Sequence, residues 1–252
     1  MSSPSARRPR TTSPEGSADM TDKHLSSQFD SELNSVSAHV MAMGGLVESQ
    51  IADAIYALSQ FSAEVADRVI QTEERVNAAE VEIDRELSTI IARRQPTAVD
   101  LRLLIAISKT TANLERVGDE ATRIARMVKS IIDSGAARQL PSSSIRLAAD
   151  LALALLRKSL DAFARLDAAE ALNIIKQDNE IDQEYNSFLR KLITYMMEDA
   201  KTISPSLDVL FVAKAIERIG DHAKNIAEFT IYIVKSADVR HAPLSKIESA
   251  VK

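Results

Sequence analysis

The chain contains no cysteine and no tryptophan, and its 252 residues include only 6 glycines and 7 prolines. Without cysteine the protein has no disulfides, no cysteine-ligated iron–sulfur cluster and no thiolate zinc site. Aromatic residues make up only 4% of the chain. This scarcity of glycine, proline and aromatic residues is typical of proteins built from long helices, and it argues against a β-sandwich or barrel.

Several function classes are also disfavoured by what is missing. The net charge of −5 gives no general excess of basic side chains, so direct binding of nucleic acid is not expected. The apolar segment LALALL at residues 151–156 is far shorter than the roughly 20 residues that a transmembrane helix needs. No G-x-x-x-x-G-K-[ST] motif is present, so nucleotide binding is not expected either.

Apolar residues recur every three or four positions through most of the chain, which predicts six helices. Connections within each set of three are short, so neighbouring helices are expected to be antiparallel. The longest break, SGAARQLPSSS at residues 134–144, separates the two sets. We therefore predict an all-α fold of two three-helix bundles. The predicted helices span about residues 27–58, 62–94, 97–134, 144–166, 167–198 and 204–236.

Helix signals and composition divide the chain further. Thr97 and Asp167 are predicted N-caps, and Ser204 followed by Pro205 is predicted to begin the last helix. The N-terminal stretch is rich in Ser, Pro and Arg and has no apolar period, so we expect it to be disordered, with Met20 as a candidate natural start. The expected divisions are a disordered tail at 1–24, a first bundle at 25–134, a second bundle at 144–238 and a loose tail at 239–252.

Two segments of the third and sixth predicted helices are nearly the same. NLERVGDEATRIAR begins at Asn113 and AIERIGDHAKNIAE begins at Ala215, a constant offset of 102 residues (215 − 113 = 102). The two segments share Glu, Arg, Gly, Asp, Ala, Ile and Ala in register. Such self-similarity at a fixed distance indicates an internal duplication. The two three-helix bundles are therefore predicted to be homologous and in tandem.

Each repeated segment carries a glutamate and an aspartate four residues apart. These are Glu115 with Asp119 and Glu217 with Asp221. Like charges at this spacing on a helix repel each other. A helical wheel of the sixth helix places Glu217 and Asp221 roughly opposite its apolar side, and hence outside the core. A solvated acidic surface is the simplest interpretation of these pairs. Their duplication favours a specific binding site instead.

The preceding helix of each bundle has oxygen-bearing side chains at a matching height. They are Glu73 with Asn77 in the second helix and Asp178 with Asp182 in the fifth. Converging carboxylates are stabilised by a cation, and oxygen ligands suit Mg²⁺, Mn²⁺, Ca²⁺ or iron. The amide Asn77 lowers the negative charge of the first site, so a weaker first site is expected.

Other candidates carry less weight. A glycine separates the acids of each repeat, and Gly118 and Gly220 would admit either a neighbouring helix or a metal-bound water. Glu80 lies six residues beyond the expected height of the site and is predicted to face solvent. His222 adjoins Asp221 but has no counterpart in the first repeat, which makes it a weak candidate ligand.

The motifs ERVGDEA and ERIGDHA, the two three-helix halves and the upstream DNEID resemble the PhoU family of bacterial phosphate-uptake regulators, over about residues 23 to 242. The resemblance implies a cytoplasmic, non-enzymatic negative regulator of the phosphate-starvation (Pho) response. It implies coupling of the Pst importer ATPase to the Pho sensor histidine kinase, with membrane association only through these partners, and we expect a homodimer. It also implies one metal cluster per half, with Glu73-x-x-x-Asn77 as the departure from the E/D-x-x-x-D motif.

Two other function classes stay open. A carboxylate-bridged metalloenzyme would bring acids and histidines together inside the bundle as Glu-x-x-His motifs, and no such pair of motifs is present. A metal-free helical adaptor has the same helical pattern and needs no site at all. Metal analysis of the purified protein separates this adaptor from a metal-binding regulator.

Overall fold

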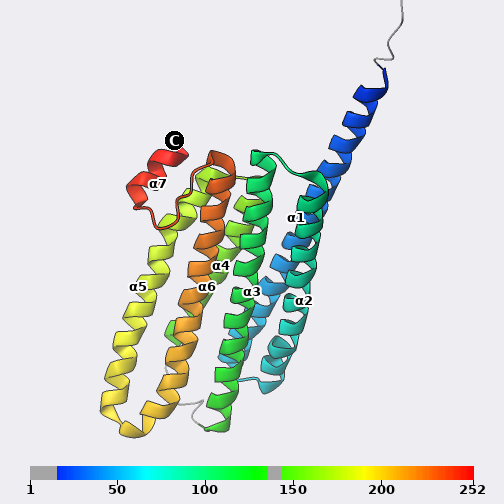
Figure 1. The fold of residues 1–252 in the computed structure, drawn as a ribbon. Coiled ribbons are helices and arrows are strands. Elements are labelled where there is room, and N and C mark those ends of the chain that lie inside the picture. The colour runs from blue at the N-terminus through cyan, green and yellow to red at the C-terminus, as the bar shows by residue number, and fades with distance from the viewer. Residues whose placement is uncertain (1–15, 136–142) are drawn as a thin grey trace, which may run out of the picture.

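The computed structural model describes residues 16–135 and 143–252, and within these ranges the chain forms helices and no strand (Figure 1). The all-α prediction is confirmed, and six long helices correspond to the six predicted ones. A short 3₁₀ helix and a C-terminal helix were not predicted. The elements are α1 (Gly16–Gln60), α2 (Ala63–Arg94), α3 (Ala98–Asp133), α4 (Ser143–Arg165), α5 (Ala168–Glu198), η1 (Ala200–Thr202), α6 (Ile203–Lys235) and α7 (Leu244–Val251).

The helices form two antiparallel sets, α1–α3 and α4–α6, that pack side by side (Figure 1). Helices α3 and α6 run antiparallel along the middle, and α1 meets α4. The apolar residues spaced by three and four along α1 are buried, as the periodicity predicts. They join one hydrophobic core that continues through both sets. Those on α1 include Val36, Val40, Met43, Val47 and Ile51.

Helix ends agree with the sequence signals in part. Asp167 is the N-cap of α5, and its carboxylate accepts two backbone N–H bonds at 3.0 and 3.1 Å. Thr97 lies at the N-cap position of α3, but its hydroxyl donates to Asp100 at 2.6 Å and caps no backbone N–H. Helix α6 begins at Ile203, so Pro205 is its third residue and not its first. Proline is tolerated there because the first four N–H groups of a helix lack intrahelical partners.

Both predicted tails differ from expectation. Helix α1 begins at Gly16, inside the predicted disordered tail, because a formed helix extends at little cost through polar residues. Residues 1–15 of that tail lie outside the described residues. The predicted loose tail at 239–252 instead contains α7, with Ile247 3% exposed. Apolar residues three and four apart give this short helix one apolar side, and Glu248 also contacts Lys176 of α5 at 2.6 Å.

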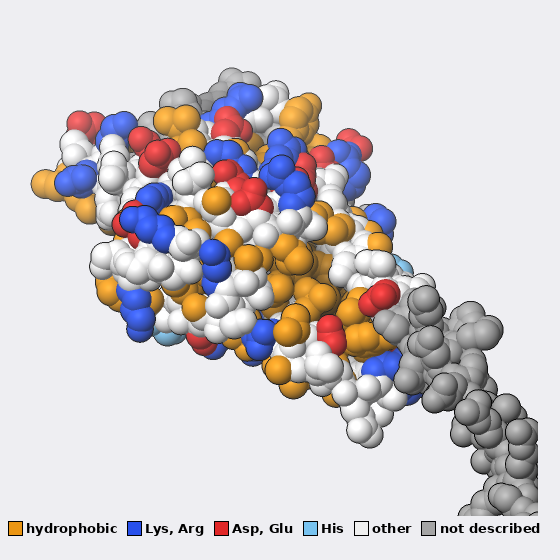
Figure 2. All heavy atoms as spheres, turned by 90° about the horizontal axis from the view of Figure 1, so that it is seen from above, with side chains coloured by type: hydrophobic (Ala, Val, Ile, Leu, Met, Phe, Trp, Pro, Cys, Tyr) orange, Lys and Arg blue, Asp and Glu red, His pale blue; other side chains and the backbone are white. Residues whose placement is uncertain are grey.

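Some apolar side chains stay exposed, and they recur in both repeats. On α6, Ile203, Leu207 and Phe211 are 44%, 43% and 52% exposed. On α3, Leu101 and Ile105 are exposed at the positions that correspond to Ile203 and Leu207. Viewed from above, hydrophobic side chains also gather in the middle of one end of the molecule (Figure 2).

None of the described helices has the length and apolar composition to cross a bilayer.

Candidate metal centre

The structure brings together three acids of the first half, which we call the first cluster. Glu73 of α2 and Glu115 and Asp119 of α3 each place one carboxylate oxygen within 4.8 Å of the others. Glu73 and Glu115 are half-buried and Asp119 is exposed. These three acids of α2 and α3 therefore converge, whereas counting from the turn predicted only a similar height. Asn77 lies one turn beyond Glu73 on α2 and is exposed.

Buried polar groups hold Glu73 in place. Gln50 of α1 is 1% exposed and donates to Glu73 Oε2 at 3.0 Å, and the Thr122 hydroxyl donates to the same oxygen at 2.8 Å. Glu73 Oε1 and Gln50 Oε1 are buried without a hydrogen-bond partner. A Cβ atom on Gly118 would lie 3.1 Å from Gln50 Oε1 and 3.4 Å from Glu73 Oε2. Glycine thus leaves room for these oxygens beside α3.

Sequence reasoning missed Gln50. It stands between the buried positions Val47 and Ile51 of the apolar stripe, and a lone amide on such a stripe is the signal that would have found it. A buried amide is retained where its hydrogen bonds are needed. Its role is to orient the Glu73 carboxylate toward α3.

Two acids of the first cluster, Glu115 and Glu73, have a raised pKa. Burial, followed by the charges of Asp119, Glu80 and Glu73, raises the pKa of Glu115 to about 7. Burial also raises the pKa of Glu73, against hydrogen bonds from Gln50 and Thr122 that lower it. Negative charge is therefore costly at this site, and a bound cation would remove that cost.

The placement of Glu80 corrects the sequence prediction. Glu80 is half-buried, and its charge acts on Glu115. Burial raises its pKa, as do the charges of Asp84 and Asp119. The register explains the error: Glu73 contacts Thr122, so in an antiparallel pair residue 80 falls beside residue 115. Counting from the turn had placed the site about one helical turn away.

The second cluster consists of Asp178 and Asp182 of α5 and Glu217 and Asp221 of α6. Burial, followed by the charges of Glu217, Asp178 and Asp182, raises the pKa of Asp221 to about 6. Burial, Asp178 and Glu217 also raise the pKa of Asp182. Glu217, Asp178 and Asp182 therefore all lie close enough to act on the Asp221 carboxylate.

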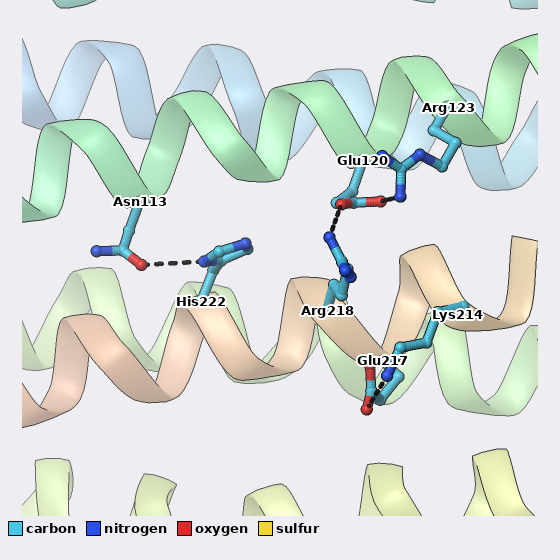
Figure 3. Close-up of polar contacts among 7 residues, drawn as sticks. All are labelled: Asn113, Glu120, Arg123, Lys214, Glu217, Arg218 and His222. Carbon is cyan, nitrogen blue, oxygen red and sulfur yellow. Dashed lines mark hydrogen bonds and ion pairs between the residues drawn. The ribbon is translucent and has the colours of Figure 1, made fainter. Parts of the chain in front are cut away.

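Two lysines distinguish the second cluster from the first. Lys224 Nζ lies 2.8 Å from Asp178 Oδ2, and Lys214 Nζ lies 2.6 Å from Glu217 Oε1 (Figure 3). Lys224 occupies the position that Thr122 holds in the first repeat (224 − 122 = 102). The second cluster thus contains its own cations, which compete with an added metal ion.

The helical wheel placed only the acids of α6 outside the core, and Asp178 of α5 is buried. It is 2% exposed and faces Gly220 of α6. A Cβ atom on Gly220 would lie 3.5 Å from Asp178 Oδ1 and 2.8 Å from Ile181 Cδ1. The missing side chain lets α5 approach α6 at this point and bury the carboxylate. Both repeat glycines therefore serve close helix packing.

His222 points away from the second cluster. Its Nδ1 lies 3.0 Å from Asn113 Oδ1 of α3 (Figure 3). Burial, followed by the charges of Arg116 and Arg218, lowers the pKa of His222 to about 4. Glu120 occupies the corresponding place in the first repeat and lies 3.3 Å from Arg218 of α6. Both side chains join α3 to α6.

The chain matches known proteins along most of its length. A PhoU domain matches residues 40–128 and 145–230. The phosphate-specific transport system accessory protein PhoU homolog of a Burkholderia species is 52% identical over 223 residues, covering 88% of this chain and 95% of that protein. The crystal structure of PhoU from Pseudomonas aeruginosa has a TM-score of 0.80 at 43% identity, covering 83% of this chain and 100% of that one. The phosphate transport system regulatory protein PhoU from Streptococcus pneumoniae has a TM-score of 0.77 at 28% identity, covering 83% and 98%.

Proposed function

Because the chain belongs to the PhoU family, we propose that it is an accessory protein of phosphate-specific transport that represses the phosphate-starvation response. In this role it binds the importer ATPase and the Pho sensor histidine kinase in the cytoplasm and catalyses no reaction. The names of its relatives support the link to phosphate transport. The observation that carries the molecular part is the first cluster at the duplicated motif, where Glu73, Glu115 and Asp119 converge.

The first cluster fits a hard divalent cation such as Mg²⁺ or Mn²⁺, or iron. Its three ligand oxygens come from Glu73, Glu115 and Asp119. Glu73 Oε1 is buried and has no hydrogen-bond partner, so it is available as a ligand. Oxygen ligands alone suit these ions. A bound ion would neutralise the acids and hold α2 against α3.

The second cluster is the weaker of the two proposed metal sites. Lys214 and Lys224 already neutralise part of its charge, and either ammonium must move before an ion binds. From the sequence, the neutral Asn77 in the first half had predicted that the second cluster binds metal more tightly. We expect the first cluster to bind a metal ion more tightly than the second. An ammonium group inside the second cluster weakens metal binding more than the replacement of one carboxylate by Asn77 weakens it in the first.

Partner binding has a physical basis in the exposed apolar residues of α3 and α6. Isolated apolar side chains on a surface are ordinary, but Ile203, Leu207 and Phe211 follow one another along a single side of α6. Contiguous exposed apolar surface marks sites of protein contact. We expect this stripe to contact the ATPase or the kinase, or a second copy in a homodimer.

The cellular experiment compares a deletion strain with complemented strains in high phosphate. Deletion should switch on phosphate-starvation genes, and the wild-type chain should restore repression. The variant Leu207→Asp with Phe211→Asp should fail to restore it and should lose the ATPase or the kinase in a pull-down. Val81→Asp is the matched control, since Val81 is 69% exposed on α2. Unchanged repression in the deletion strain contradicts the proposed function.

The two rival classes make different predictions. A metal-free adaptor predicts that purified protein treated with Mn²⁺ melts at the same temperature as protein treated with a chelator. The first-cluster proposal predicts a rise with metal that Glu115→Gln with Asp119→Asn abolishes. A metalloenzyme predicts that this pair of substitutions removes a turnover reaction and leaves repression intact.

A further inference from the structure

A large cavity adjoins the second cluster, because Asp221, Lys214 and Lys224 also line it. Its volume is about 830 Å³, and it is lined by residues of α3, α5 and α6 and of the segment 240–247. At one end Arg240 lies over the ring of Phe229, with 5.8 Å from the guanidinium carbon to the ring centre. Nothing in the proposed regulatory function uses this cavity.

The lining of the cavity is strongly cationic. Six lysine and arginine side chains line it, against two carboxylates, Asp221 and Glu228. This is the reverse of the chain as a whole, whose net charge is −5. A concave site with one sign of charge concentrates ions of the opposite sign. The cationic residues are Lys109, Arg116, Lys214, Arg218, Lys224 and Arg240.

The cations differ in how strongly they are already engaged. Lys214, Lys224, Arg218 and Arg240 each pair with an acid. On the wall formed by α3, Lys109 and Arg116 are exposed, and the described part of the chain gives neither of them an ion pair. These two side chains are therefore available to contact a ligand, and the charge of Arg116 also acts on Glu115 and Glu80. Arg218 projects from α6 toward Glu120 of α3 (Figure 3).

Amide groups add further donors to the same wall. Asn113 Oδ1 accepts from Asn225 Nδ2 at 3.0 Å and lies 3.0 Å from His222 Nδ1. Asn113 Nδ2 donates to the Lys109 carbonyl at 2.8 Å. Each amide nitrogen carries two protons, so both asparagines keep an N–H for another acceptor. The polar groups of the cavity thus favour an acceptor-rich, negatively charged ligand.

We propose that this cavity binds a small molecule that carries several phosphate groups. Lysine and arginine are the side chains that bind phosphate, and arginine does so through paired N–H donors. The volume suits a ligand of nucleotide size, since ligand cavities span roughly 300–1,000 Å³, and a single phosphate would leave most of it empty. A P-loop contacts phosphate through the backbone N–H groups of a glycine-rich loop. In this cavity the lysine and arginine side chains supply the contacts to phosphate, so no P-loop is needed.

The test is calorimetric titration of the metal-free full-length protein, prepared on a chelating resin, with tripolyphosphate, ATP and inorganic phosphate. Tripolyphosphate and ATP should each bind at one site per chain, and at least tenfold more tightly than inorganic phosphate. Lys109→Ala with Arg116→Ala should weaken binding at least tenfold. Tighter binding of ATP than of tripolyphosphate also supports the proposal and assigns a nucleotide.

The matched control is Arg126→Ala with Arg190→Ala, which removes the same charge from exposed positions outside the cavity. It should bind like the wild type, and thermal melting should show all proteins folded. Equal weakening in the control, equal affinity for inorganic phosphate, or no binding of either polyphosphate overturns the proposal. Because metal is absent throughout, these outcomes do not depend on metal occupancy of the carboxylate clusters or on the regulatory function.

Discussion

At the scale of single residues, Thr122 and Lys224 occupy the same position of the repeat and do opposite things to the neighbouring acid. Thr122 donates a neutral hydrogen bond to Glu73, whereas Lys224 brings a full positive charge to Asp178. Together with Lys214, this difference separates a cluster that needs a cation from one that contains cations.

Replacing Lys224 by threonine should make the second cluster more like the first, with Lys214 still paired to Glu217. In the presence of Mn²⁺, Lys224→Thr should gain a larger rise in melting temperature than the wild type, since a ligand of the folded state stabilises by about 1.4 kcal/mol for each tenfold gain in affinity at saturation. With a chelator it should be less stable than the wild type, because Asp178 stays buried without its partner.

The control for this substitution is Lys191→Thr, an exposed position on α5. It makes the same change in charge and should leave the metal-induced shift as it is in the wild type. A Lys224→Thr protein that responds to Mn²⁺ no more than this control would show that the lysine does not block metal binding.

Glu115 gives the metal-free protein a distinct pH dependence. Its pKa rises from 4.5 to about 7 on folding, mainly through burial. Between these two values the folded protein holds more protons than the unfolded chain, so stability falls as pH rises through this range. Melting temperatures of metal-free protein should therefore decrease from about pH 5 to about pH 8, and Glu115→Gln should reduce this decrease. Glu74→Gln, exposed on α2, serves as the control and should leave the slope unchanged.

At the scale of helices, two adjacent glycines of α1 illustrate how packing decides the effect of a residue. A Cβ atom on Gly44 would lie 2.9 Å from Leu160 Cδ1 and 3.1 Å from Cδ2, where α1 meets α4. Leu160 is 4% exposed and has little room to move. A Cβ atom on Gly45 would meet nothing within 4 Å.

The two alanine substitutions should therefore change the free energy of unfolding in opposite directions. Gly45→Ala should stabilise the protein by about 0.5–1 kcal/mol, because alanine favours the helix at an exposed site. Gly44→Ala gains the same propensity but overpacks the contact with Leu160, at a typical cost of about 1–3 kcal/mol. Urea denaturation of both variants measures the difference. Equal stabilisation by the two would mean that α4 accommodates the added methyl group.

At the scale of the whole molecule, one hydrophobic core passes through both sets of helices. Glu120 is buried at the junction and contacts Arg123 of its own half and Arg218 of the other, at 3.0 and 3.3 Å. We therefore expect the two halves to unfold together in a single urea transition. Hydrogen exchange should report the same urea midpoint for amides of α2 and for amides of α5. Separate midpoints would contradict this coupling.

The helical fold and the clustered acids were predictable because both depend on patterns that are local in the sequence. The repeated E-R-[IV]-G-D placed Glu115 and Glu217 on their helices, and the turns fixed the approximate height of Glu73 and Asp178. Gln50, which contacts Thr122 from 72 residues away, depends on side-chain contacts between distant segments. The docking of α7 is likewise set by a partner surface on α5, which no short apolar pattern specifies.

Glu120 and His222 stand at one repeat position, as do Thr122 and Lys224, and in each pair the two copies differ. A dimer of identical three-helix subunits must carry the same residue at both copies of every position. Joining the halves in one chain removes that restriction, since each half accepts substitutions on its own. The protein therefore keeps the geometry of a symmetric pair while placing, in neighbouring sites, two chemistries that identical subunits could not hold.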